Sequence, residues 1–424
     1  HFIKMTVACF LLLGVALIFA SEGAEAKSPE WSYGGDAGDS SDAVAISDDG
    51  EYISYGKHDD YVVFLDNDDN TPEWSYYVDV NNDENYVDMS ADGYYIVQGG
   101  GNAEVLLFNK TNDDDEPEWE YDIPGGNQVE SIAISDDGTN IVAGCTNGLV
   151  IYFSTSSSTP LWSYTCSGCS SMIDVALSAN GSVIVANSGN GDAVVFDESS
   201  STPEWTYEAN YDLDAAAVSS DGNYIAVGEG GGASSRKVYF FSSDNSTPLW
   251  TFSPGSGTKA ISIDDTGNNI AVASNKIYLL DRSGDEQWSY NEISKDIDIT
   301  GSGKYIAGIG NSRAQVFFKT SSTPIWSSDT WYGCCNKVAI SEDGLSVIVG
   351  YTYGLKYFES SAPSASINSV SSNITGQWES VTFNGSGSDT DGTISSYEWS
   401  SSIDGVFSSQ SVFSIISLDH LSIK

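Results

Sequence analysis

Tryptophan recurs at regular intervals along most of this chain, and the period constrains the possible fold more than any other feature. Successive separations of 43, 45, 43, 43, 45, 38 and 38 residues connect Trp31, Trp74, Trp119, Trp162, Trp205, Trp250, Trp288 and Trp326. A period of this length is typical of folds that repeat one supersecondary unit, such as solenoids and propellers.

Each repeat contains four short β-patterns. The tryptophan begins an aromatic strand such as 31–33, and a second apolar strand ends in Ser-Asp-Asp-Gly, as at 47–50. A third and an aromatic fourth strand follow, for example 141–144 and 150–153. Asp-Gly between apolar runs indicates a hairpin, and four strands in about 40 residues are typical of a propeller blade. We find no sustained helical period in this region, which argues against paired-helix repeats.

The order of the patterns predicts how the ring closes. The series begins with the tryptophan strand at Pro29–Tyr33 and ends with the aromatic strand Leu355–Phe358. If the serine-aspartate strand is innermost, the last blade has three strands within 338–358, and Pro29–Tyr33 supplies its outer strand. We therefore predict an all-β fold, an eight-bladed β-propeller over residues 29–359 closed by its N-terminal strand, with seven blades as the alternative. The eight tryptophans are expected to pack between blades.

These repeats resemble two known propeller families. The alternation of a serine-Asp-Gly hairpin with aromatic and tryptophan strands resembles WD-repeat propellers, although the Trp-Asp and Gly-His pairs are absent. The stretch 279–288 is similar to the repeat of pyrroloquinoline quinone propellers, in which Asp and Gly precede a tryptophan that packs between blades. Most repeats carry Thr-Pro where that family has Thr-Gly. The resemblance therefore implies the architecture, and we expect neither a cofactor nor catalytic residues.

The N-terminal residues have the pattern of an export signal. Lys4 precedes an apolar run over 7–20, and Ala24-Glu25-Ala26 follows as a small-residue cleavage site. Fourteen apolar residues are too few for a comfortable bilayer span. We predict a signal peptide over 1–26, cleaved after Ala26, and a secreted or cell-surface protein without a membrane span.

The composition changes after the last repeat. Residues 360–365 are small and polar and are typical of a linker. Residues 381–389, 391–394 and 397–399 resemble the polycystic kidney disease (PKD) type domain, an immunoglobulin-like sandwich of extracellular proteins. A complete sandwich needs about 100 residues, so 366–424 would form a partial one. The resemblance allows calcium at Asp389 and Asp391.

The cysteines suggest two local bridges. Cys166 and Cys169 are expected to form a disulfide, with a zinc half-site or a redox pair as alternatives. The adjacent Cys334 and Cys335 resemble the vicinal disulfide near the cofactor of quinone-dependent alcohol dehydrogenases, so a quinone-dependent oxidoreductase remains an alternative function. We find no matching calcium ligands or basic residue for such a site. Cys145 falls in an expected strand and is predicted to be a buried free thiol.

The excess of acidic residues argues against nucleic acid as a partner. Sixty Asp and Glu against 16 Lys and Arg give a formal net charge of -44, and such a polyanion repels nucleic acid. Calcium could be suggested by the paired carboxylates Asp48, Asp49, Asp136 and Asp137. In hairpins, however, the main role of such paired carboxylates is to form the turn. Of three histidines only His58 lies in the repeats, and no serine nucleophile motif accompanies it.

These features favour a binding or scaffolding protein over an enzyme. We expect a loop face of the propeller to bind a protein or a glycan, with Tyr211, Trp331 and Tyr332 as aromatic residues that could stack on sugar rings. A structural component of a surface layer is the third possibility, beside binding and quinone-dependent oxidation.

Overall fold

The protein is all-β. The computed structural model describes residues 15–16, 25–35, 41–58, 60–79, 84–111, 116–310, 312–330, 335–360, 364–370, 380–388, 398–401, 405–408 and 412–416, and none of these is helical. Accordingly, none of them forms a helix long and apolar enough to cross a membrane. The contacts divide the chain into one unit of Ala26–Glu359 and another of His1–Glu25 with Ser360–Lys424.

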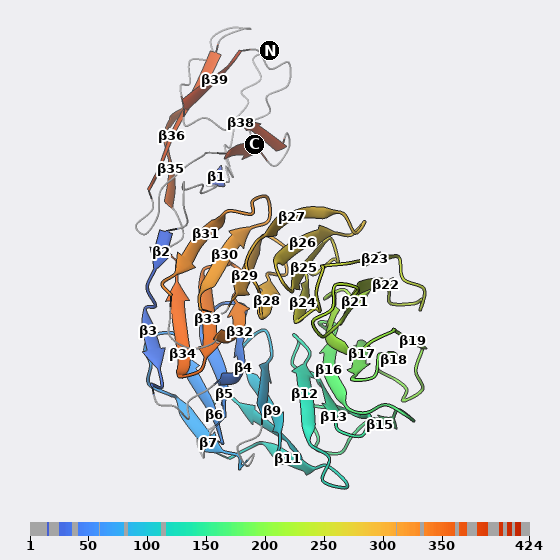
Figure 1. Ribbon diagram of the computed structural model, residues 1–424. Coiled ribbons are helices and arrows are strands. Elements are labelled where there is room, and N and C mark those ends of the chain that lie inside the picture. The colour runs from blue at the N-terminus through green and yellow to red at the C-terminus, as the bar shows by residue number, and fades with distance from the viewer. Residues whose placement is uncertain are drawn as a thin grey trace, which may run out of the picture. The chain divides into compact units, whose positions relative to one another are not determined.

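The larger unit is a ring of eight sheets, each numbered here as a blade (Figure 1). Blades 1 to 4 are β4–β7 (Ser41–Ile46, Tyr52–Lys57, Tyr61–Asp66, Trp74–Tyr77), β8–β11 (Asn85–Met89, Tyr95–Gly100, Glu104–Asn109, Trp119–Asp122), β12–β15 (Val129–Ile134, Asn140–Cys145, Leu149–Ser154, Trp162–Thr165) and β16–β19 (Met172–Leu177, Val183–Ser188, Asp192–Asp197, Trp205–Glu208). Blades 5 to 7 are β20–β23 (Leu213–Val218, Tyr224–Glu229, Val238–Ser242, Trp250–Phe252), β24–β27 (Ala260–Ile263, Asn269–Ala273, Ile277–Asp281, Glu286–Tyr290) and β28–β31 (Asp296–Ile299, Tyr305–Ile309, Ala314–Phe318, Pro324–Ser328). Blade 8 combines β32–β34 (Cys335–Ile340, Ser346–Tyr351, Gly354–Glu359) with β3 (Trp31–Tyr33).

Blade 8 confirms closure by the N-terminal strand. β3 pairs antiparallel with β34, with Trp31 opposite Tyr357 and Tyr33 opposite Leu355. The N–H of Glu30 adds a 2.9 Å hydrogen bond to the carbonyl of Tyr357. The eight-bladed prediction is therefore confirmed, and the seam between the two ends of the ring lies within one sheet, which leaves no unpaired edge on β34.

Blade 7 carries a fifth strand. β2 (Glu25–Lys27) lies on the outer edge of β31, before the chain enters blade 8. The expected cleavage after Ala26 falls within β2, and cleavage itself stays a prediction.

The tryptophans lie at the start of, or within, the outer strands and connect neighbouring blades. The indole Nε1 of Trp119 donates to the carbonyl of Thr155 at 2.8 Å, and that of Trp162 donates to Glu198 at 2.9 Å, each in the next blade. Equivalent bonds start from Trp31, Trp205, Trp250 and Trp288. Within the described residues, the buried Nε1 of Trp74 has no such partner. Trp74, Trp119, Trp162, Trp205, Trp288 and Trp326 also pack on an aromatic ring of the following blade.

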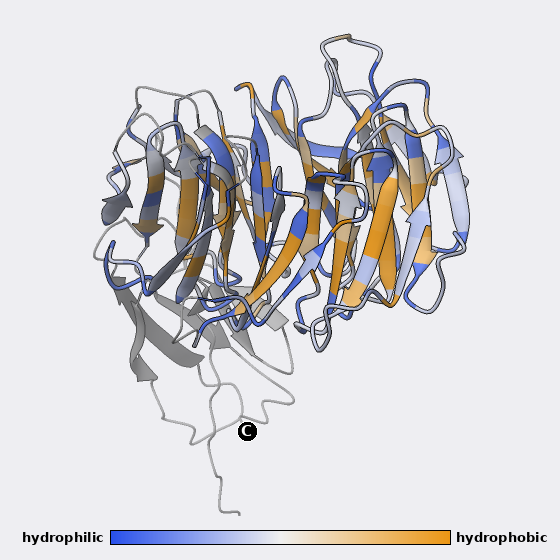
Figure 2. Ribbon diagram, turned by 90° about the horizontal axis from the view of Figure 1, so that it is seen from below, coloured by the Kyte–Doolittle hydropathy of each residue, from blue (hydrophilic) through white to orange (hydrophobic). Residues whose placement is uncertain are grey.

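The hydrophobic core lies between the blades and follows the middle strands. Figure 2 shows hydrophobic residues concentrated in the strands. The second and third strands of a blade contribute fully buried side chains such as Ile53, Phe64, Phe153 and Phe240. Side chains of a β-strand alternate between two faces, so the burial of consecutive residues in these middle strands means that neighbouring blades cover both faces of the sheet.

The second unit contains short strands outside the ring. β35 (Ser364–Val370), β36 (Ser380–Ser388) and β39 (Val412–Ile416) form one sheet, and β1 (Val15–Ala16), β37 (Glu398–Ser401) and β38 (Gly405–Ser408) form another. β35 begins within the expected linker 360–365. The structure describes no side chains here, and Asp389 and Asp391 lie outside the described residues. The PKD-type sandwich and its calcium ligands therefore stay predictions.

Candidate functional site: the acidic mouth of the axial channel

The first strands of the blades surround an axial channel with a cavity at one end. Its volume is about 510 Å³, and its lining comes mainly from β4, β8, β24, β28 and β32 and from the turns that follow first strands. We call the five residues between the first and second strands of a blade its inner turn, and the end of the channel formed by these turns the mouth. A cavity of this volume is within the range of ligand pockets.

The inner turns are built by their serine and aspartate side chains. In blade 1, Ser47 Oγ donates to Asp49 Oδ1 at 2.6 Å and accepts the N–H of Tyr52 at 3.0 Å. Asp49 Oδ1 also accepts the N–H of Glu51. Gly50 has a φ of 74°, a left-handed conformation that favours glycine. The second aspartate of Ser-Asp-Asp-Gly is thus a turn former.

The first aspartate of the same motif has a different position. Asp48 and Asp136 line the cavity, together with Asp265 and Glu342 at the corresponding positions of blades 6 and 8. Burial, followed by the charges of Asp136, Glu342 and Asp265, raises the pKa of Asp48 to about 6. Burial and the charge of Asp265 likewise raise the pKa of Asp136. The mouth therefore concentrates negative charge that no cation of the described residues compensates within ion-pair distance.

A closed ring of hydrogen bonds fixes the mouth. Each inner turn donates to the next one: Asp48 N to Ala91 O (2.8 Å), Ala91 N to Asp136 O (3.0 Å), Asp137 N to Ala179 O (3.1 Å), Ala179 N to Ser220 O (3.1 Å), Asp221 N to Asp265 O (3.0 Å), Asp265 N to Gly301 O (2.9 Å) and Glu342 N to Asp48 O (2.9 Å). A side chain supplies the remaining connection, because the Glu342 carboxylate accepts the N–H groups of Gly301 and Ser302. The carboxylates at the mouth are therefore held on a rigid support.

Deeper carboxylates connect the first strands of neighbouring blades. Asp88 Oδ2 accepts the N–H of Ile134 at 2.9 Å, and Asp298 Oδ2 accepts that of Ile340 at 3.1 Å. Asp174 Oδ2 accepts the N–H of Ala216 at 2.7 Å. These strands border the channel and have backbone donors that the sheet does not satisfy, so the carboxylates complete their hydrogen bonding.

Burial dominates the ionisation of these deeper groups. It raises the pKa of Asp88 to about 7, against the opposing effect of the N–H donors of Ile134 and Met89. It raises the pKa values of Asp174 and Asp298 to about 6. The three side chains are half-buried, and those of Asp88 and Asp298 line the cavity.

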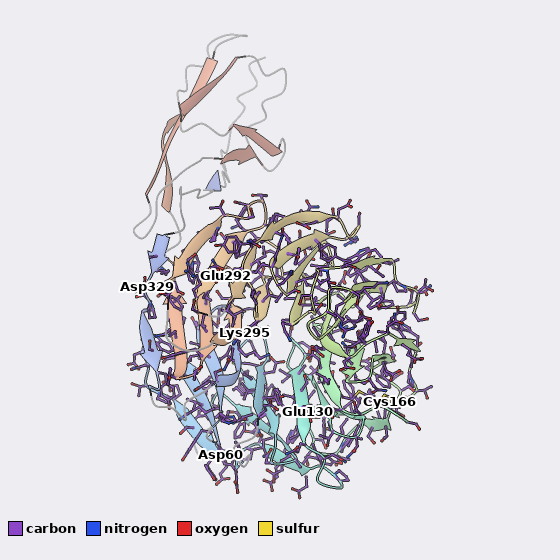
Figure 3. The ribbon with its side chains drawn as sticks, in the orientation of Figure 1. Asp60, Glu130, Cys166, Glu292, Lys295 and Asp329 are labelled. Carbon is purple, nitrogen blue, oxygen red and sulfur yellow. A yellow bond between two sulfur atoms is a disulfide. The ribbon has the colours of Figure 1, made fainter. Side chains whose placement is uncertain are left out.

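The other end of the channel carries charges of both signs. Lys259 and Lys295 immediately precede β24 and β28, and Lys337 lies in β32. The charge of Lys337 opposes the burial that raises the pKa values of Asp174 and Asp296. Figure 3 shows Lys295 and Glu130 near the inner side of the ring.

The other residues singled out from the sequence do not join this site. Cys166 and Cys169 form a disulfide, and Cys145 is buried with a free thiol. Tyr211 is 42 % exposed, but the Arg236 guanidinium lies 3.4 Å from its ring centroid. His58 lies in a turn. Trp331, Tyr332 and Cys334 are outside the described residues, as is the side chain of Cys335.

The channel residues Asp88, Asp298, Asp265 and Glu342 were not predicted from the sequence. A signal was available, because aligning the inner-turn motifs places Asp88, Ser262 and Asp298 where other first strands carry alanine, such as Ala45 and Ala133. A carboxylate in the innermost strand of an otherwise small and apolar set indicates a channel-facing position.

Comparisons with known proteins support the fold. No family model matches the sequence, and no curated protein matches it. Among solved structures, it is similar to Sqt1 of Chaetomium thermophilum bound to the N-terminus of the ribosomal protein L10, with a TM-score of 0.65 and 15% identity over 78% of this chain and 99% of that chain. At this identity the likeness supports the propeller fold alone.

Proposed function

We propose that this protein is a secreted or cell-surface binding protein that holds a cationic segment of a partner protein at the acidic mouth. The observation that carries the proposal is the cavity at the mouth, where Asp48, Asp136, Asp265 and Glu342 converge on a support closed by hydrogen bonds. A preorganised site loses little conformational entropy on binding, and complementary charge accelerates association.

The arrangement of the carboxylates favours an extended ligand over a single ion. Among the described residues, the mouth carboxylates do not come close enough together to form a metal-type ligand group. Lysine and arginine side chains of one peptide segment can reach several separated carboxylates at once. The solved Sqt1 structure, in which a propeller is bound to the N-terminus of another protein, supports a peptide partner for this architecture.

Glycan binding and quinone-dependent oxidation remain alternatives without an observation in their favour. Of the aromatic residues suggested for sugar stacking, the structure describes only Tyr211. The Arg236 guanidinium already lies over the face of its ring. Cofactor absorbance and alcohol-dependent dye reduction after incubation with pyrroloquinoline quinone and calcium would reveal the enzyme.

Calorimetric titration with a synthetic peptide of about ten residues, rich in lysine and arginine, tests the proposal. We expect the double variant Asp48→Asn with Asp136→Asn to bind about tenfold more weakly, because about 1.4 kcal/mol corresponds to a tenfold change. The matched control is Asp68→Asn with Glu204→Gln, which removes two exposed charges away from the cavity. Equal losses in the two variants would mean that the net charge of the protein, not the mouth, attracts the peptide.

Localisation requires a separate experiment. Expression of the full chain with a C-terminal tag should place the tag outside the cell and remove residues 1–26, as N-terminal sequencing would show. Retention of the uncleaved chain inside the cell would refute secretion without affecting the peptide result.

A further inference from the structure

A second cluster of chemically capable side chains lies away from the mouth. Figure 3 places Cys166 toward the periphery of the ring. Cys166 and Cys169 belong to the connection between β15 and β16, and Asp192 begins β18. One ligand atom from each of these three residues lies within 4.8 Å of the other two. In the described part of the chain, no other three Cys, His, Asp or Glu side chains are grouped in this way.

Asp192 is held against the cysteines by its own neighbours. Its Oδ2 lies 3.4 Å from Cys169 Sγ, and the Asn190 Nδ2 donates to it at 3.1 Å. Its backbone N–H donates to Ser188 Oγ at 3.0 Å. The carboxylate is therefore positioned before any ligand arrives, which a binding site requires.

The cysteine loop is fixed by contacts independent of the disulfide. Asn190 Oδ1 accepts the N–H of Ser170 at 3.0 Å, and Asn190 Nδ2 also donates to the carbonyl of Gly168 at 3.2 Å. The N–H of Cys166 donates to the carbonyl of Gly148 at 2.9 Å. Gly168 has a φ of 100°, which other residues rarely adopt. These contacts would keep both sulfurs on the same side of the loop after reduction.

We propose that Cys166, Cys169 and Asp192 bind a thiophilic divalent cation, such as zinc, when the disulfide is reduced. A Cys-x-x-Cys loop is a common source of two zinc ligands, and a carboxylate oxygen is an accepted third one. In a tetrahedral site with bonds of roughly 2.3 Å to sulfur and 2.1 Å to oxygen, the sulfur and oxygen are roughly 3.6 Å apart. The observed 3.4 Å between Cys169 Sγ and Asp192 Oδ2 is close to this value. Water can take the fourth position, because the three side chains are half-buried.

The chemistry balances in two steps. Two molecules of a small thiol reductant transfer two electrons and two protons to the S–S bond, which breaks into two protein thiols while the reductant forms its own disulfide. The cation then displaces one proton from each thiol and binds both thiolates and the Asp192 carboxylate. The oxidised and metal-bound forms therefore exclude each other, and the site is independent of the acidic mouth.

Cobalt(II) is the probe for this site, because thiolate coordination gives it an intense ligand-to-metal charge-transfer absorption. The full chain is reduced with a phosphine, freed of the reductant without oxygen, and titrated with cobalt and then with competing zinc. We expect one equivalent of cobalt to give thiolate absorption that zinc abolishes, and we expect the oxidised protein to give none.

Variants assign the ligands. Cys166→Ser should abolish the thiolate absorption, whereas Cys145→Ser and the double variant Cys334→Ser with Cys335→Ser should retain it. Asp192→Asn preserves the shape of the side chain and should weaken cobalt binding at least about tenfold, whereas Asp197→Asn, at the other end of β18, is its matched control. Urea unfolding without metal shows whether each variant is folded. Absorption that survives Cys166→Ser, or none in the reduced wild type, would overturn the proposal, and undiminished affinity in Asp192→Asn would overturn the three-ligand assignment.

Discussion

Lowering the pH from 8 to 5 should stabilise the propeller. The native pKa of Asp88 is about 7, and those of Asp174 and Asp298 are about 6, against an ordinary value of 3.8. At pH values between the ordinary pKa and the native pKa of these groups, the folded protein binds more protons than the unfolded chain. The free energy of unfolding therefore falls as pH rises through this window, and the contribution is fully present only below the unfolded pKa.

The magnitude follows from the same values. Protonation of Asp88 between pH 8 and pH 5 adds about 2.6 kcal/mol to the free energy of unfolding, given its native pKa of about 7. Asp174 and Asp298 add about 1.4 kcal/mol each. For these three groups the sum is about 5 kcal/mol before screening by water, and Asp48, whose pKa is also raised to about 6, adds in the same direction. Carboxyl groups whose pKa is lowered, such as Asp69 with its hydrogen bonds from Thr71, change the free energy of unfolding only at lower pH.

Urea unfolding followed by tryptophan fluorescence measures this dependence. Urea is preferable to guanidinium chloride because a salt would screen the charges. In Asp88→Asn, which retains an oxygen acceptor for the N–H of Ile134, the gain in stability between pH 8 and pH 5 should shrink by up to about 2.6 kcal/mol, the share of Asp88. Asp68→Asn, at an exposed position outside the channel, should leave it unchanged. Equal or lower stability at pH 5 than at pH 8, or full dependence in Asp88→Asn, would refute the reasoning.

Three further predictions concern the ring. Deleting residues 27–35 removes β3 and should lower the melting temperature strongly, whereas truncation after residue 362 should leave the main unfolding transition of the propeller unchanged in differential scanning calorimetry. Trp31→Ala and Trp288→Ala should each cost about 3 kcal/mol, but only Trp31→Ala should make the seam sensitive to limited proteolysis, because β3 has no hairpin connection to its blade. Glu342→Ala leaves the N–H groups of Gly301 and Ser302 without their acceptor and should cost about 1–3 kcal/mol in urea unfolding, whereas the exposed Glu204→Ala should cost little.

The sequence was sufficient for the fold because its signals are local and repeated. The spacing of the tryptophans and the Ser-Asp-Gly turns determine the number and order of strands, and the one-strand offset between Trp31 and Phe358 predicts the seam. The same turns were only partly understood. Asp49 is a turn former as expected, whereas its neighbour Asp48 lines the cavity. The order of residues in a turn does not reveal which of two adjacent carboxylates points toward the cavity.

Single channel positions such as Asp88 could be found by aligning the repeats, but the assembly of the mouth could not be predicted, because its residues come from blades that are distant in the chain. Asp48 and Glu342 meet only after the ring closes, so neither residue forms a recognisable motif with its sequence neighbours. The approach of Asp192 to Cys169 is likewise tertiary, since 22 residues and two strands separate them. Spacing within Cys-x-x-Cys identified two ligands, but only the packing of β18 against the cysteine loop provides the third.

The ring of hydrogen bonds around the mouth also restricts how this protein can change in length. Every inner turn has five residues in all eight blades, whereas the loop between β21 and β22 in blade 5 has grown to eight residues, Gly230–Lys237, on the opposite side of the ring. A residue inserted into one inner turn would displace its donor and its acceptor together and interrupt the whole circle. Insertions and deletions that evolution or engineering accepts should therefore accumulate away from the mouth, which makes the mouth the part of the surface whose dimensions are most strictly inherited.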